Sequence, residues 1–453
     1  MSPKIASNLR RYTAPVLISL LLGSAVLAEE PSRTTIYSAS VAFQDKAAPA
    51  EQAPAVIPDF GGDFWCRQKL TGNWCGERPC LAQQGITFDG SVTQFYQGVA
   101  HGGLNETFRY GGHADYMLNM DMGKLMEMKG LFVSMHAETR FGQDVNLDAV
   151  GLAPVNSIML YPSQEHETAI TGLLITQALS EEWLVTMGKF NLLDLFTQIY
   201  PQIGRGVDGF MNITSLTPIS VGRPLNLSIM GAGITKLNGG RVQGTVAVLD
   251  THNSSTTSGF DDLFDDGAVI VGYWRLFTSL CELPGSHALM GIYSNKQFTS
   301  IDPLSWSFLP GVGIVPGQET GTWNLTYFWE QKLWVDPCNA QRNIGALTSL
   351  GLSDGNPNPI RWGGTVAVQA QGLVSDRPAD TMGVSYFYTG LSSEFKSLGG
   401  PLIDLQDVQG VELYYNVAVT PWFHLTADLQ VVEPADTAKD TAVVMGLRGK
   451  IDF

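Results

Sequence analysis

From Ile86 to the C-terminus, hydrophobic and polar residues alternate along the chain. The segment that begins at Leu131 shows the pattern most clearly, with polar residues at every second position: Ser134, His136, Glu138 and Arg140. Successive side chains of a β-strand point to opposite sides, so this strand has one apolar face and one ionic face. Segments of about ten residues are long enough for a tilted strand to cross a bilayer. The alternation therefore predicts strands suited to a membrane barrel.

The same alternation recurs in other segments of the chain, whereas the segments 169–179 and 344–352 alternate poorly. The segment from Gly112 places Asp115 on its polar face, the segment from Thr322 places Glu330 and Lys332 there, and the last segment places Arg448 there. Sixteen candidate strands begin near Ile86, Gly112, Leu131, Ala169, Trp183, Leu225, Arg241, Gly267, Ser286, Thr322, Ile344, Arg361, Thr381, Gly410, Phe423 and Thr441. An even number of strands is typical of a bacterial outer-membrane barrel.

Connection lengths separate a membrane barrel from a soluble sandwich, which also alternates. The connections at 142–168, 191–224 and 296–321 are long, whereas those at 180–182 and 420–422 are short. Long and short connections alternate along the chain. Outer-membrane barrels have long loops outside the cell and short turns in the periplasm. We therefore expect an all-β fold, a transmembrane antiparallel β-barrel of the bacterial outer membrane with sixteen strands.

Composition and charge agree with this fold class. The 453 residues are 44% hydrophobic, 10% aromatic and only 15% charged, with a net charge of -16. Such a chain can bury a core, which argues against disorder and against a coiled coil. Its acidity would repel phosphate groups, so we expect no nucleic-acid partner.

The N-terminal region predicts export. Lys4, Arg10 and Arg11 precede a short apolar stretch at 14–22, and small residues at 26–28 suit a cleavage site, so we assign 1–28 to a signal peptide. Its removal would leave 24 basic against 43 acidic residues, a net charge of -19. Residues 29–65 are rich in Pro and Ala and predict a periplasmic linker. Residues 66–453 would form the barrel, preceded by a short periplasmic segment with a helix near 77–84.

The five cysteines suit an oxidising compartment. Cys281 and Cys338 fall in connections that the strand count places at the periplasmic side, so we expect a disulfide between them. Cys66, Cys75 and Cys80 lie close together in the sequence, without a spacing that suggests zinc. The sequence thus predicts no metal site and no cofactor.

Both ends of the barrel region carry family motifs. Residues 70–78 read LTGNWCGER and residues 81–86 read LAQQGI, while ELYY at 412–415, TPW at 420–422 and GLR at 446–448 precede Phe453. This pattern resembles the OprB-type carbohydrate-selective porins, which begin with L-T-G-D-W-G-G-x-R. The resemblance implies a sixteen-stranded outer-membrane barrel that admits sugars by diffusion. Cys75 and Cys80 depart from the pattern, which leaves open how the N-terminal segment is held.

In such a pore the chemistry lies at a constriction, where polar side chains offer hydrogen bonds to hydroxyl groups. The predicted permeant-contacting residues are Asp115, His136, Glu138, Arg140, Glu330, Lys332 and Arg448. Each of them could instead be an ordinary wet residue of a polar interior. The loop 191–224 contains Phe196, Tyr200 and Phe210, and it either folds into the barrel or packs on other loops or on a neighbouring subunit.

Two other functions remain as alternatives, a barrel enzyme such as a lipid hydrolase and a structural or adhesive barrel. Residues 351–355 match the G-x-S-x-G pattern around Ser353, but Pro357 and Pro359 prevent the helix that this pattern needs. The acidic loop 261–266 is better explained as a solvated tip than as a calcium site. We therefore expect a porin, not an enzyme, with small sugars or polyols as permeants. Its other partners would be outer-membrane lipids and lipopolysaccharide, and it would act as a monomer or a homotrimer.

Overall fold

The computed structural model describes residues 59–160, 162, 168–200, 207–400 and 403–453. The predicted signal peptide and residues 29–58 of the predicted linker lie outside the described residues. No described helix is long and apolar enough to cross a membrane.

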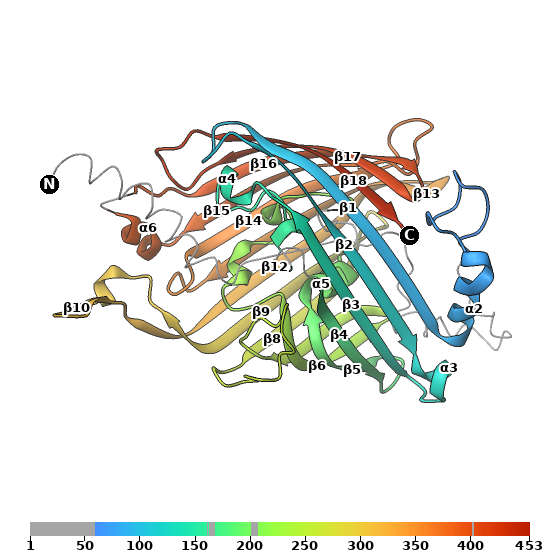
Figure 1. The fold of residues 1–453 in the computed structure, drawn as a ribbon, viewed down its shortest axis with the longest axis horizontal. Helices are drawn as coiled ribbons and strands as arrows, with labels where there is room; N and C mark the ends of the chain where they lie inside the picture. Colours follow the sequence, from blue (N-terminus) through green and yellow to red (C-terminus); the bar gives the residue numbers. More distant parts are fainter. Residues whose placement is uncertain (1–58, 161, 163–167, 201–206, 401–402) are drawn as a thin grey trace.

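Sixteen strands of the described residues form one closed antiparallel barrel (Figure 1). They agree with the sixteen predicted segments, and their first residues differ from the predicted ones by five positions or fewer. The barrel strands are β1 (Ile86–His101), β2 (Phe108–Asp121), β3 (Leu131–Gly142), β4 (Thr168–Ala178), β5 (Trp183–Asn191), β6 (Ser228–Asn238), β7 (Arg241–Leu249), β8 (Val269–Leu280), β9 (Leu283–Thr299), β12 (Gln318–Asp336), β13 (Asn339–Ser353), β14 (Ile360–Gln371), β15 (Thr381–Leu391), β16 (Val408–Thr420), β17 (Phe423–Glu433) and β18 (Ala442–Asp452). A separate small hairpin joins β10 (Ser307–Leu309) to β11 (Gly313–Val315).

The two faces of the barrel wall differ as the alternation predicts. On β16, Glu412 is 0% exposed, whereas its neighbour Leu413 is 51% exposed. Large hydrophobic side chains also point outward elsewhere on the wall, including Tyr96, Trp274 and Trp323. An apolar outer face and a polar inner face reverse the pattern of a soluble protein and match a barrel that is surrounded by lipid.

Short turns join the strands at one end of the barrel. The turn between β8 and β9 consists of Cys281 and Glu282, both with positive φ (50° and 65°), as a two-residue hairpin of type I′ requires. Cys338 lies in the equally short turn between β12 and β13. All five cysteines are free, exposed thiols, so the predicted disulfide between Cys281 and Cys338 is absent from the structure. A position at the same end of the barrel is not enough for a disulfide, because the two Cβ atoms must also lie about 4 Å apart.

The helices of the described residues lie in the connections between strands or before β1. The α-helices are α2 (Glu77–Gln84), α3 (Met122–Met126), α4 (Asn146–Ala149), α5 (Leu192–Ile199) and α6 (Ser393–Gly399), and the 3-10 turns are η2 (Trp74–Gly76), η3 (Ile158–Leu160), η4 (Ile213–Ser215), η5 (Ile219–Gly222) and η6 (Pro303–Ser305). The predicted helix at 77–84 is confirmed as α2. Gly85 ends it with φ 99°, a left-handed conformation that favours glycine. In Figure 1, α2 and α3 lie at one end of the barrel, and α6 and β10 lie at the other.

Two basic side chains attach the segment before β1 to the seam where β1 pairs with β18. Lys69 Nζ lies 3.1 Å from Asp89 Oδ1 on β1 and 3.8 Å from Asp452 Oδ1 on β18. Arg78 of α2 donates to the carbonyl oxygens of Phe88 (2.8 Å) and Phe453 (2.9 Å). These contacts join residues almost 400 positions apart, so the N-terminal segment braces the closure of the barrel.

The last residues of the predicted linker, 59–65, also contact this segment and the barrel. The guanidinium of Arg78 lies 4.6 Å above the ring of Phe60, and the indole N–H of Trp422 donates to the carbonyl oxygen of Phe64 (2.8 Å). Residues 59–65 therefore belong structurally to the segment that braces the seam.

Replacing Arg78 with Ala should weaken the seam. The substitution leaves the carbonyl oxygens of Phe88 and Phe453 without this donor, so the free energy of unfolding should fall by about 1–3 kcal/mol. Thermal unfolding of the purified protein, followed by its electrophoretic mobility with and without heating, measures the change. Lys124→Ala, which removes an exposed charge from α3 at the same end, should change little. Equal effects of both substitutions would contradict the assignment.

Candidate functional site

The connection between β5 and β6 folds into the barrel. Several of its large side chains are almost completely buried, namely Tyr200, Phe210, Met211, Ile213 and Leu216. Its 3-10 turn η4 contacts β14 and β15, and η5 contacts β13 and β14. Of the two alternatives that the sequence left open for this loop, the structure selects the inward one. We call residues 192–200 and 207–227 the inward loop.

A carboxylate on the barrel wall holds the middle of the inward loop. Glu412 accepts hydrogen bonds from the backbone N–H groups of Met211 and Asn212 (3.1 Å for Asn212) and from the hydroxyl of Ser215 (2.6 Å). Arg448 donates to the carbonyl oxygen of Gly209 (3.0 Å). Backbone groups that enter a protein interior need such partners, and the wall supplies them.

An ion pair between Asp208 and Lys450 adds a third attachment of this loop. Lys450 Nζ lies 2.7 Å from Asp208 Oδ2. Burial alone would raise the pKa of Asp208, but Lys450, His424 and Arg448 outweigh burial and hold the pKa below its usual value. A lowered folded-state pKa stabilises the attachment above the ordinary pKa of aspartate, and this contribution disappears as the pH falls through the lowered pKa.

A second connection, 143–160, also turns inward and meets the inward loop. The carbonyl oxygen of Val155 accepts from Gln430 (2.8 Å) and from Gln97 (3.2 Å), and Arg140 donates to the carbonyl oxygen of Met159. The backbone N–H of Ser157 donates to the carbonyl oxygen of Met211 (2.8 Å). The two connections thus form one bonded layer across the interior.

A cluster of carboxylates and imidazoles fastens the start of α5 to β2 and β3. His136 Nδ1 donates to Asp194 Oδ2 on α5 (2.8 Å), and His136 Nε2 lies 3.1 Å from Asp115 Oδ1. Asn191 caps α5 by accepting from the backbone N–H of Leu193 (3.1 Å), while its amide donates to Glu138 Oε2 (3.2 Å). The loop helix and the wall therefore share one polar network.

The other end of α5 is held by β8, which lies five strands from β3 around the barrel. Arg275 of β8 donates to the carbonyl oxygen of Ile199, the last residue of α5 (2.7 Å), and forms an ion pair with Glu330 of β12. The hydroxyls of Tyr200 and Tyr273 lie 3.0 Å apart. Because both ends of α5 are anchored to the wall, the helix is held in place inside the barrel.

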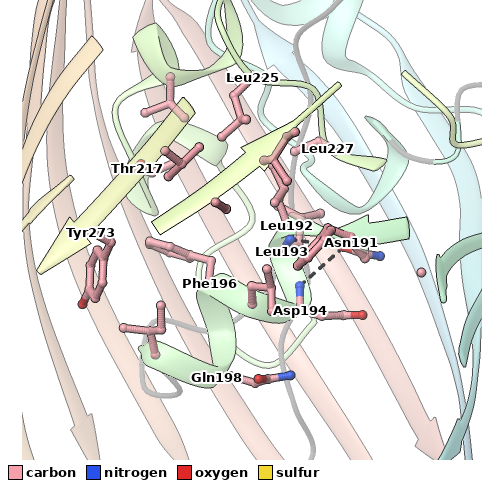
Figure 2. Close-up of a pocket in the computed structure, with 18 of the residues that line it drawn as sticks. Asn191, Leu192, Leu193, Asp194, Phe196, Gln198, Thr217, Leu225, Leu227 and Tyr273 are labelled. Atoms are coloured by element: carbon pink, nitrogen blue, oxygen red, sulfur yellow. Dashed lines mark hydrogen bonds between the residues drawn. The ribbon is translucent and has the colours of Figure 1, made fainter. Parts of the chain in front are cut away.

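A cavity of about 330 Å³ lies beside α5. Most of its wall is apolar, including Leu192, Phe196, Leu227 and Tyr273, and the polar side chains His136, Asn191 and Asp194 also line it. In Figure 2, Phe196 extends from α5 toward Tyr273, and Asp194 points away from that side. The cavity therefore combines an apolar wall with a polar edge.

Comparison with known proteins identifies the family of this barrel. Residues 105–453 match the family model described as carbohydrate-selective porin, OprB family. The chain belongs to the OprB family. The protein is thus a carbohydrate porin of the outer membrane. None of the curated proteins compared with it matches.

Solved structures share the fold. The high-pH structure of Pseudomonas putida OprB has a TM-score of 0.74 at 18% sequence identity, covering 86% of this chain and 100% of that chain. The low-pH structure of the same protein has a TM-score of 0.53 at 14% identity, covering 86% of this chain and 99% of that chain.

The seven predicted site residues fall into separate groups in this OprB-family barrel. Asp115, His136 and Glu138 come together in the cluster at the start of α5, and His136 lines the cavity. The other four make separate contacts: Arg140 with Met159, Glu330 with Arg275, Lys332 with Asn343 (2.8 Å) and Arg448 with Gly209. The structure does not gather the seven around one point.

Sequence reasoning missed several residues that build the site of this OprB-family member. Asp194, Asn191 and Arg275 hold α5, and Glu412 holds the middle of the inward loop. Alternation already placed Glu412 on the polar face of its strand, which was a usable signal. Asp194 lies in a connection, where alternation gives no information.

Replacing Glu412 with Ala should release the inward loop. The substitution removes the acceptor of three hydrogen bonds, so we expect a larger and noisier single-channel conductance and a free energy of unfolding lower by about 1–3 kcal/mol. Planar-bilayer recording and thermal unfolding test this. Glu433→Ala, at the end of β17 and bonded to Gln409, is the matched control and should leave conductance unchanged. Unchanged conductance in Glu412→Ala would show that the loop is held elsewhere.

Proposed function

We propose that small neutral sugars and polyols cross this porin through the cavity beside α5. The observation that carries the proposal is the pairing of an apolar wall with a polar edge in that cavity. A sugar ring presents hydroxyl groups around its edge and C–H groups on its faces. Phe196 and Tyr273 are suited to the faces, and His136, Asn191 and Asp194 are suited to the hydroxyls. Contacts of this kind are individually weak, as rapid passage requires.

Arg140 and Glu138 would tune this passage. Arg140 is half-buried and bonded to the carbonyl of Met159, so it holds the second inward connection. Glu138 is almost fully buried beside Asn191, the cap of α5. A guanidinium offers several donors in a fixed fork, which suits adjacent sugar hydroxyls. Glu138 would act through the position of α5.

The outward face supports a lipid environment. Exposed aromatic and aliphatic side chains alternate along the strands, as expected for contact with outer-membrane lipids and the acyl chains of lipopolysaccharide. The same face could pack against further copies in a homotrimer, or the barrel could remain a monomer.

An enzymatic role has little support among the described residues. Ser353, the centre of the G-x-S-x-G match, is 2% exposed and donates to the carbonyl oxygen of Ile360. A nucleophile needs access to its substrate and a base within hydrogen-bond reach. A purely structural barrel would have a blocked interior. The cavity beside α5 argues against this role, because it leaves part of the interior unfilled.

Replacing Arg140 with Ala should widen the path. Loss of the bond to Met159 loosens the second inward connection, so conductance should rise. Discrimination between a hexose and an equally sized solute with fewer hydroxyls should fall by about threefold to tenfold, the effect of losing about 1 kcal/mol of hydrogen bonding. Liposome swelling with a panel of sugars and polyols measures both effects.

Arg361→Ala is the control for this experiment, because it removes an exposed guanidinium near the start of β14. It should leave swelling rates unchanged. If Arg140→Ala and Glu138→Ala barrels fold normally and keep the wild-type conductance and sugar preference, the selectivity lies elsewhere. If wild-type liposomes admit no sugar, the proposed route itself is wrong.

The pore should also favour neutral solutes and cations over anions of equal size. The expected mature charge of -19 gives a negative field at the mouth. Part of this charge lies in loops, so the preference should be modest and should shrink as salt is raised from about 0.1 M to about 1 M, where screening acts within about 3 Å. Reversal potentials in potassium chloride gradients measure it. An anion preference at low salt would contradict this expectation.

A further inference from the structure

Two short motifs on neighbouring strands bring four potential metal ligands together. His113-Ala114-Asp115 lies on β2 and His136-Ala137-Glu138 lies on β3. In each motif the first and third side chains share the inner face of the wall, and Asp115 is paired directly with Glu138 in the antiparallel register. All four residues are at least 96% buried. The motifs thus place two imidazoles and two carboxylates in one enclosed patch.

The spacing of the donor atoms suits a small divalent ion. One donor atom each from His113, Asp115 and Glu138 lies within 4.8 Å of the other two. His136 Nε2 lies 3.1 Å from Asp115 Oδ1 and 3.9 Å from Glu138 Oε1, and His113 Nε2 lies 3.7 Å from Glu138 Oε1. Ligand bonds of about 2.0–2.1 Å in a tetrahedron put neighbouring ligand atoms about 3.3 Å apart. The three measured separations, 3.1, 3.9 and 3.7 Å, lie within about 0.6 Å of this value.

The hydrogen bond of His136 to Asp194 is a second, independent indication. Metal-binding histidines typically donate their other ring N–H to a carboxylate, which fixes the tautomer. His136 Nδ1 makes this contact with Asp194 Oδ2 at 2.8 Å. In that tautomer Nε2 carries a lone pair and faces the oxygen of Asp115, another acceptor. Two acceptors 3.1 Å apart require a cation or a further proton between them.

The charge of the patch favours a cation. The three carboxylates of Asp115, Glu138 and Asp194 outnumber the two imidazoles in this network. Burying unbalanced charge is costly, and a divalent ion would offset two of the three charges. His136 and Asp194 also line the cavity beside α5, so the patch borders that cavity.

We propose that His113, His136, Asp115 and Glu138 bind a first-row divalent transition-metal ion of the zinc class, with Asp194 orienting His136. Imidazole and carboxylate ligands suit such ions, whereas calcium prefers oxygen ligands alone. The ion would link β2, β3 and α5, so it would stabilise the position of the inward loop. The metal site shares His136, Glu138 and Asp194 with the proposed sugar route, and separate measurements test the two proposals.

A second group of potential ligands serves as an internal control. Asp250, His252 and Asp262 lie close together in the connection between β7 and β8. Asp262 is more than half exposed, and His252 also contacts Asp266, which pairs with Lys296. This group lies outside the barrel strands, and the variant His252→Gln removes its imidazole without touching the barrel wall.

The test is titration of the intact, detergent-purified barrel with zinc chloride after treatment with a chelator. After alkylation of its five exposed thiols, the His252→Gln protein should bind one zinc ion, detected by calorimetry and by metal analysis after desalting, and binding should raise its unfolding temperature. His113→Gln and Glu138→Gln in that background should abolish this binding. Asp194→Asn should weaken it by about 10–100-fold, as expected for a residue that orients a ligand.

Cobalt chloride provides a readout that does not depend on any wall variant folding. In the His252→Gln protein, Co²⁺ bound by two imidazoles and two carboxylates in a tetrahedron should give intense visible absorption, which zinc should displace. No binding by the His252→Gln protein, only the weak absorption of octahedral cobalt, or full binding in His113→Gln would each overturn the proposal. Sugar-driven liposome swelling of the chelated protein reports separately on the pore, so failure of one proposal does not mimic failure of the other.

Discussion

The structure depends on one constraint, the absence of hydrogen-bond partners for the backbone inside a bilayer. A sheet in that environment cannot leave an open edge, so its first and last strands must pair. Here β1 pairs with β18 along ten residue pairs, and Lys69 and Arg78 brace the joint from outside the sheet. Closing sixteen strands gives a ring too wide for strand side chains alone to fill. The closure therefore creates the space that the rest of the molecule has to narrow.

Connections narrow that space, and this explains why so many wall residues are polar. A loop that enters the barrel brings backbone N–H and C=O groups that need partners. Glu412, Gln430 and Gln97 meet this need on the wall, and Arg275 does so at the end of α5. Polar residues that the alternation assigns to a wet lumen thus hold loops in place. Any effect that they have on permeants acts partly through the position of those loops.

The sequence predicted the wall much better than the interior. Alternation with a period of two, together with the lengths of the connections, located the sixteen strands, and a short helical segment located α2, because these patterns depend on neighbours in the chain. The contact of His136 with Asp194 joins residues 58 positions apart across a connection without periodicity, so no local pattern could reveal it. Two side chains on one face of a strand are predictable. Their partners on an inward loop require the fold.

The motifs around His113 and His136 are a second case in which local sequence patterns do not reveal a contact. A search for metal ligands by Cys and His spacing along one segment finds nothing, because each motif supplies only one imidazole and one carboxylate. Only the register of β2 against β3, which sets Asp115 opposite Glu138, brings the two halves together. Strand register is in turn dictated by which face must meet lipid, since a slip by one residue would turn these four polar side chains outward. The lipid environment that requires a closed barrel thus also fixes the register that assembles the patch.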